Sequence, residues 1–183
     1  MTNQFTATER RELLDFVRSV IASRFGGETP AVPEIPRLRE NGSCFVTLHL
    51  GGELRGCIGS IEAFELLGQS LRRNALNAAF EDPRFPPLAA DELPEITLEI
   101  SVLTPLNEIS SPEEFVVGRD GIIMRLHNRG AVFLPQVAPE QGWDRETTLS
   151  YLARKAGLPG NAWRDPGARF FTFQAEVFSE DAI

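Results

Sequence analysis

Residues 44–59 read CFVTLHLGGELRGCIG, and this stretch decides the fold. Its first half, Cys44 to Leu50, is rich in residues that favour strands, and Gly51-Gly52 is a two-residue turn signal. The chain then returns from Glu53 to Ile58, so we expect a β-hairpin. A two-residue turn also fixes the register, and it predicts that Leu50 pairs with Glu53, Leu48 with Arg55 and Val46 with Cys57.

Two amphipathic helices are expected on either side of this hairpin. Thr6 and Glu9 have the spacing of a capping box, apolar residues then recur at helical intervals, and Gly26-Gly27 ends the first helix. The second helix is expected over about 65–80, where Asp82-Pro83 stops it. Each has one apolar face, so both should pack on the core of the sheet.

The second half of the chain adds more strands than crossovers. Residues 96–103 alternate between apolar and polar side chains, which is typical of a half-buried strand. A second hairpin is expected over 121–134 with its turn near 128–130, then a helix over about 146–156 and a strand over 169–178. The sequence therefore predicts an α+β fold, with a mainly antiparallel sheet and flanking helices in a single domain over residues 5–179.

Composition excludes several classes of protein. The chain has 183 residues and a net charge of -8, which disfavours nonspecific nucleic-acid binding and an anionic membrane surface. No apolar run approaches the length of about 20 residues that a spanning helix needs, and residues 1–4 do not begin a secretory signal. The only two cysteines, Cys44 and Cys57, are expected to stay reduced in the cytoplasm and to form no zinc site.

The Leu54–Gly59 segment is the best candidate for a chemical site. In the predicted register Arg55 and Cys57 share a face, and a neighbouring guanidinium favours the nucleophilic thiolate. His49 would lie on the opposite face and could not serve as its base, unless a bulge at Gly56 shifts the register by one. The alternative is structural, with Cys57 as a small buried apolar group and the glycines needed only by the backbone.

Two further clusters could bind a ligand. The proline-rich loop 81–87 could present Asp82 and Arg84 as a polar recognition surface, although the same residues suit helix termination and an ion pair. Gln136 can donate and accept hydrogen bonds, and Trp143 can stack on a flat ligand or act as a hydrophobic staple. Phosphate-loop, dinucleotide-binding and nucleophile-elbow motifs are absent, and so are the clustered cysteines of an iron–sulfur site, so no cofactor or metal is predicted.

Taken together, these motifs resemble the AMMECR1-domain family over about residues 5–179. The resemblance is carried, in order, by Phe45–Leu48, Leu54–Gly59, Asp82–Pro87, Gly118–Gly121, Leu134–Val137, Gly142-Trp143 and Lys155–Pro159. It implies an α+β fold with a larger and a smaller lobe, and an intracellular protein. It also implies membership of the AmmeMemoRadiSam group, in which prokaryotic relatives are often encoded beside, or fused to, Memo-like and radical-SAM proteins.

Three functional hypotheses follow from the sequence. The first is an enzyme, or an accessory of a modification pathway with those partners, that uses Cys57 as a nucleophile assisted by Arg55. The second is a noncatalytic module that holds a small ligand or a protein in a groove between the lobes, with contacts from Gly56, Gly59, Asp82, Arg84 and Gln136. The third, an RNA-associated regulator, is disfavoured by the acidic charge.

Overall fold

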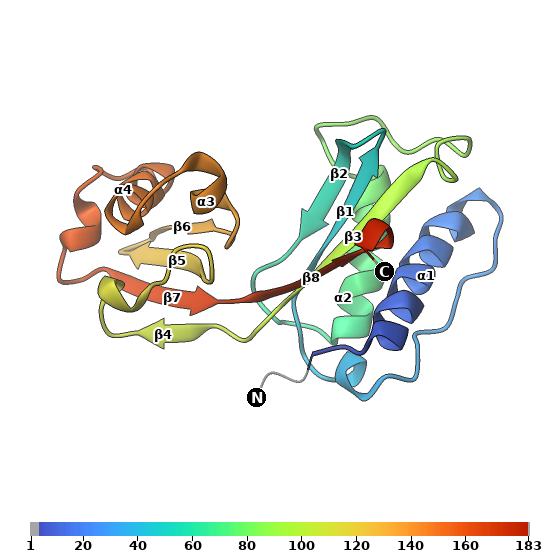
Figure 1. Ribbon diagram of the computed structural model, residues 1–183, viewed down its shortest axis with the longest axis horizontal. Helices are drawn as coiled ribbons and strands as arrows, with labels where there is room; N and C mark the ends of the chain where they lie inside the picture. The colour runs from blue at the N-terminus through green and yellow to red at the C-terminus, as the bar shows by residue number, and fades with distance from the viewer. Residues whose placement is uncertain (1–3, 183) are drawn as a thin grey trace. The chain divides into compact units, whose positions relative to one another are not determined.

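The computed structural model describes residues 4–182, which divide into two compact units. The first unit takes in the described part of Met1–Thr104 and of Glu176–Ile183, and the second is Pro105–Ala175. Each unit contains one four-stranded sheet (Figure 1). The α+β prediction is confirmed, with a larger and a smaller part, and none of the described helices is long and apolar enough to cross a membrane.

The sheet of the first unit has the strand order β2-β1-β3-β8. Its strands are β1 (Cys44–Leu50), β2 (Glu53–Gly59), β3 (Ile96–Leu103) and β8 (Ala175–Ser179). Helices α1 (Ala7–Ala22) and α2 (Leu67–Phe80) share one apolar core with the face that carries Val46, Leu48, Leu98 and Ile100. That face is fully buried, because each of these four side chains is 0% exposed.

Local sequence signals set the ends of α1. The Thr6 side chain accepts a hydrogen bond from the Glu9 amide, and the Glu9 carboxylate accepts one from the Thr6 amide, so the predicted capping box is confirmed. A 3-10 turn, Ser23–Phe25, follows α1 and ends at Gly26, whose φ of 100° suits glycine. The remaining 3-10 turns of the described chain are Pro36–Arg39, Pro112–Glu114, Ala162–Arg164 and Glu180–Ala182.

The sheet of the second unit has the order β4-β7-β5-β6. Its strands are β4 (Asn107–Ile109), β5 (Gly121–Leu126), β6 (Arg129–Phe133) and β7 (Arg169–Phe173), and its helices are α3 (Val137–Gln141) and α4 (Arg145–Lys155). The α4 residues Leu149 and Leu152 join the second core with Met124 of β5. The single strand expected over 169–178 is wrong, because the chain leaves one sheet at Phe173 and enters the other at Ala175.

The hairpin of β1 and β2 forms as predicted, but its register does not. Gly51 and Gly52 have φ values of 60° and 85°, as a tight turn requires, and Leu50 pairs with Glu53. The register then shifts, because Leu48 pairs with Gly56 and Thr47 with Cys57. Arg55 is left as the extra residue of a β-bulge. The predicted pairs Leu48–Arg55 and Val46–Cys57 are therefore wrong.

Next to the bulge, β2 lies in close contact with α2. A Cβ atom on Gly56 would lie 2.1 Å from the carbonyl oxygen of Ala78, so only glycine fits at this point under the helix. The bulge places Gly56, rather than Arg55, opposite the buried Leu48. As a result, Cys57 lies on the face of the sheet that points away from α1 and α2.

Candidate functional site

The Cys57 thiol lies in a polar row that crosses three strands. Thr47 of β1 pairs with Cys57 of β2 on one side and with Glu99 of β3 on the other. These side chains lie opposite to the face of Val46 and Leu48, because neighbouring residues of a strand point to opposite faces. The Thr47 hydroxyl donates a hydrogen bond to the Cys57 Sγ atom over 3.3 Å. Cys57 is half-buried, so its sulfur is fixed without being sealed in the core.

The main chain of Cys57 is held by the loop that follows α2. β2 is an edge strand, and the amide and carbonyl of Cys57 bind side chains of this loop instead of β1. Asp82 Oδ2 accepts the Cys57 amide at 2.9 Å, and Arg84 Nη2 donates to the Cys57 carbonyl at 3.2 Å. We call these three residues, Cys57, Asp82 and Arg84, the edge latch.

The latch is internally ion-paired. Arg84 Nη2 lies 2.7 Å from Asp82 Oδ2, and the Arg84 amide also donates to Asp82. Hydrogen bonds from the Arg84 guanidinium hold the pKa of the Asp82 carboxyl well below its ordinary value; burial opposes this shift, and the Cys57 amide adds to it. The pKa of Arg84 is raised, chiefly by its bond to Asp82 and to a lesser degree by the charge of Cys57. Arg84 is thus a cation within electrostatic range of the thiol.

Arg55 has different partners from those expected. Its guanidinium forms a two-point ion pair with Glu92, with Nε and Nη2 each 2.8 Å from a carboxylate oxygen, and Nη1 donates to the Pro86 carbonyl at 3.0 Å. The bond to Arg55, followed by the amide of Ala89, lowers the pKa of Glu92. Arg55 is only 8% exposed, and its bonds to Glu92 and Pro86 connect the bulge to the segment between α2 and β3. The expectation that it lies beside Cys57 on one face rested on the register that the bulge overturns.

The two glycines of the segment admit atoms of the chain itself. Gly56 faces the Ala78 carbonyl, and a Cβ atom on Gly59 would lie 2.4 Å from the ring of Phe45. The close approaches at these two glycines are therefore made by a helix backbone and by an aromatic ring. Both positions serve the packing that holds Cys57.

The bulge also changes the position of His49. Its partners are Leu54 of β2 and Thr97 of β3, and it lies two residues from Thr47 on the same strand. His49 therefore shares the face of Cys57, which is the exception that the sequence allowed if a bulge intervened. Within residues 4–182 no hydrogen bond of the site joins His49 to Cys57, and the other histidine, His127, is exposed at the β5–β6 turn with a φ of 54°.

Gln136 and Trp143 belong to the second unit. Gln136 is exposed and immediately precedes α3. The Trp143 ring stacks on Tyr151, with centroids 4.3 Å apart and planes within 8°, and it lies 5.7 Å from the Phe133 ring. Trp143 precedes Asp144, the N-cap of α4, so it packs along that helix much as a staple residue would. One face of the indole is already occupied by its own chain.

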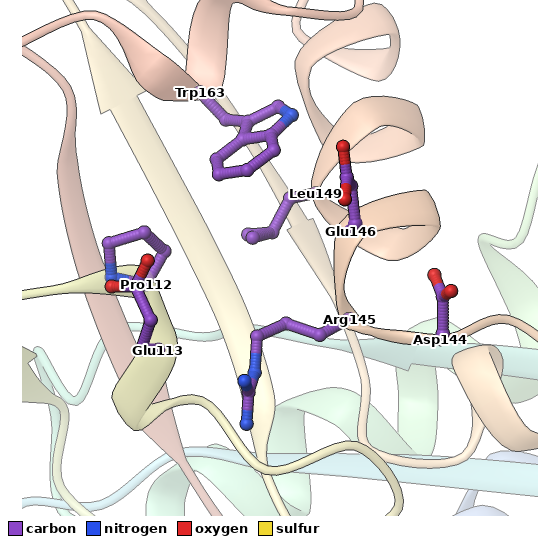
Figure 2. Close-up of a pocket in the computed structure, with 7 residues that line it drawn as sticks. All are labelled: Pro112, Glu113, Asp144, Arg145, Glu146, Leu149 and Trp163. Carbon is purple, nitrogen blue, oxygen red and sulfur yellow. The ribbon is translucent and has the colours of Figure 1, made fainter.

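The second unit also has a hollow that sequence reasoning missed. A cavity of about 320 Å³ is lined by Pro112, Glu113, Asp144, Arg145, Glu146, Leu149 and Trp163. Figure 2 shows Leu149 and the Trp163 ring between Pro112 on one side and Glu146 on the other, with Arg145 below. Three of its charged groups have partners in the chain: Arg145 donates to the Phe115 carbonyl, Glu146 pairs with Arg164, and Asp144 accepts from the Thr147 amide. No motif linked these residues, because loop and helix meet only in the fold.

Known proteins from archaea are similar to this chain over most of its length. A sequence model described as AMMECR1 matches residues 14–178. Protein MJ0810 of Methanocaldococcus jannaschii is 38% identical over 174 residues, which cover 90% of this chain and 87% of that protein. Protein NEQ441 of Nanoarchaeum equitans is 37% identical over 178 residues, 92% of this chain and 99% of that protein.

A solved structure shares the fold. The crystal structure of the uncharacterized protein PH0010 from Pyrococcus horikoshii superposes with a TM-score of 0.84 at 33% sequence identity. The superposition covers 97% of this chain and 94% of that one.

Proposed function

The chain belongs to the AMMECR1 family, and on that premise we propose that it is a thiol-dependent enzyme, or the accessory of one, with Cys57 as the nucleophile. The observation that carries the proposal is the setting of the sulfur. The Thr47 hydroxyl donates to Sγ, and the edge latch fixes both main-chain groups of Cys57. A half-exposed thiol held this firmly has little freedom to lose when a substrate binds.

The electrostatic setting of the sulfur supports the same role. The Thr47 hydroxyl donates to the sulfur and the Arg84 guanidinium binds the Cys57 carbonyl, so a hydrogen-bond donor and a cation both lie at the nucleophile. Arg84, rather than Arg55, is the cation bound at Cys57, because Arg55 is paired with Glu92. The other thiol, Cys44, has the opposite setting: it is 0% exposed, and burial raises its pKa.

The step proposed for Cys57 is a displacement at an electrophilic carbon that bears a leaving group. The thiol loses its proton to a base, the sulfur–carbon bond forms, and the bond from carbon to the leaving group breaks. The leaving group departs with the electron pair of that bond and takes up a proton. No oxidant or reductant is needed.

We place this chemistry in a cytoplasmic modification pathway with Memo-like and radical-SAM proteins as partners. The support for these partners is the family resemblance carried by the Leu54–Gly59 and Asp82–Pro87 segments. The cytoplasm keeps thiols reduced, which suits two free cysteines.

One observation favours a second candidate, a noncatalytic binding module. The side chain of Arg84 is 55% exposed, so the latch could present it to an anionic ligand or protein surface. In that case the sulfur would be dispensable, whereas the guanidinium would not.

Replacement of the chromosomal gene separates the two candidates. Cys57→Ser should abolish cellular function while the purified variant keeps the melting temperature of the wild type, and Cys44→Ser serves as the matched control. The enzyme proposal fails if Cys57→Ser supports full function. Loss of function in Arg84→Gln alone would then point to the binding module.

A further inference from the structure

The face of the first sheet that carries Cys57 also carries a histidine and a carboxylate. The bulge leaves Thr47, His49, Cys57 and Glu99 on this face, because Thr47 pairs with both Cys57 and Glu99. His49 is on the central strand of the three, two residues beyond Thr47. It is therefore the diagonal neighbour of Cys57 on one side and of Glu99 on the other.

The distances across these diagonals suit contact between side chains. Diagonal neighbours in an antiparallel sheet are about 7–8 Å apart, which long and aromatic side chains can span. An imidazole on β1 can thus reach a sulfur on β2 through one nitrogen and a carboxylate on β3 through the other. His49, Cys57 and Glu99 are all half-buried, so a change of rotamer does not require the core to open.

The charges that face His49 within the first unit are few. Glu99 lies one diagonal step away on β3, and Cys57, whose main chain binds Asp82 and Arg84, lies one diagonal step away on β2. The bulged residue Arg55, next to the His49 partner Leu54, is ion-paired with Glu92. The flanking partners Leu54 and Thr97 carry no charge, and α1 and α2 pack against the opposite face. Glu99 is thus the carboxylate placed across from the thiol, with Thr47 directly between them and His49 one diagonal step from each.

We propose that His49 is the general base of the Cys57 site and that Glu99 is the positioning residue that orients its ring. This inference rests on the proposed function of Cys57. The Cys57 thiol passes its proton to one ring nitrogen of His49 while the other ring N–H donates to Glu99. The sulfur attacks an electrophilic carbon, and the imidazolium returns the proton to the leaving group. Nucleophile, base and orienting carboxylate come from the neighbouring strands β2, β1 and β3.

The test is the rate of alkylation of Cys57 by iodoacetamide between pH 5.5 and 9, followed by peptide mass spectrometry in the full-length protein. In the wild type we expect a rate at pH 7 at least tenfold above that of glutathione, with little change from pH 6.5 to 8. His49→Ala and His49→Gln should lower the rate at pH 7 at least tenfold and restore the steep pH dependence of a free thiol. Glu99→Gln should lower it by a smaller factor, which Glu99→Asp partly restores.

His127→Asn is the matched control, because it removes the other histidine from an exposed turn and should leave the profile unchanged. If both His49 variants melt like the wild type and keep its rate profile, His49 is not the base, and a fast wild-type Cys57 still upholds the proposed nucleophile. If the wild-type Cys57 reacts no faster than glutathione, the nucleophile itself fails, and the base with it.

Discussion

Asp82→Ala is the perturbation that bears most directly on the edge latch. The variant removes the acceptor of the Cys57 amide, which lies 2.9 Å from Asp82 Oδ2. An amide left without a partner inside the fold costs about 1–3 kcal/mol. The ion pair with Arg84 adds only about 0–1 kcal/mol, because that guanidinium is largely exposed. We expect a total loss of about 2–3 kcal/mol in the free energy of unfolding.

The assays are urea unfolding and thermal melting of the variant, the wild type and Asp91→Ala, an exposed carboxylate of the same loop region. The expected loss corresponds to a fall of about 5–10 °C in melting temperature for a chain of this length, and the control should fall by no more than about 1 °C. Hydrogen exchange adds a local readout, because the Cys57 amide should lose protection before the amides of β1 and β3 do.

The pH dependence follows from the lowered pKa of Asp82. Its folded-state pKa lies below its unfolded value, so its contribution is fully present above about pH 4 and is lost as the pH falls through the folded-state value. The gap in stability between wild type and Asp82→Ala should therefore be constant from pH 5 to 8 and close on acidification. A variant as stable as Asp91→Ala, or a gap that widens toward low pH, would refute the latch.

Three further predictions test the packing around the site. Gly56→Ala should cost about 3 kcal/mol, because its Cβ would meet the Ala78 carbonyl and force α2 away from β2; a melting temperature within about 2 °C of the wild type would contradict this. A double-mutant cycle of Arg55→Ala and Glu92→Ala, followed by urea unfolding, should give a coupling energy of about 2 kcal/mol, and additive effects would argue against the ion pair. Trp143→Ala should cost about 1–2 kcal/mol by loss of ring stacking, as thermal melting would show, while leaving the alkylation rate of Cys57 unchanged.

Structural features that depend on a few neighbouring residues could be predicted from the sequence. The capping box of Thr6 and Glu9 and the turn at Gly51-Gly52 depend only on nearby atoms, and both are present in the fold. The alternation over 96–103 predicted β3 with the bounds it has. These elements were enough to predict an α+β fold.

The register of the hairpin could not be read in the same way. The shifted register places Gly56 against the Ala78 carbonyl of α2, which belongs to a segment 22 residues further along the chain. A single bulged residue reverses the faces of everything beyond it, so one contact decides the neighbours of Cys57. The sequence contained the relevant hint, since Gly56 was recognised as a position where a bulge could occur.

The sequence predicts which residues make up the candidate site, but not which of them contact one another. The motifs of the Leu54–Gly59 segment and of the loop 81–87 predict Cys57, Asp82 and Arg84 as site residues, and the fold brings the three together at the edge of β2. Arg84, and not Arg55, is the cation at Cys57, because Arg55 is paired with Glu92. Glu92 lies 37 residues from Arg55 and belongs to none of the motifs. Pairs this far apart in sequence leave no local pattern.

The measurement that tests the central claim most directly is the rate at which iodoacetamide alkylates each cysteine of the folded protein at pH 7. We predict that Cys57 reacts at least tenfold faster than glutathione and that Thr47→Val removes most of this advantage. Cys44 should stay unlabelled until the protein is unfolded, because it is fully buried. A folded protein in which Cys57 is unreactive, or reacts no faster than glutathione, would contradict the account.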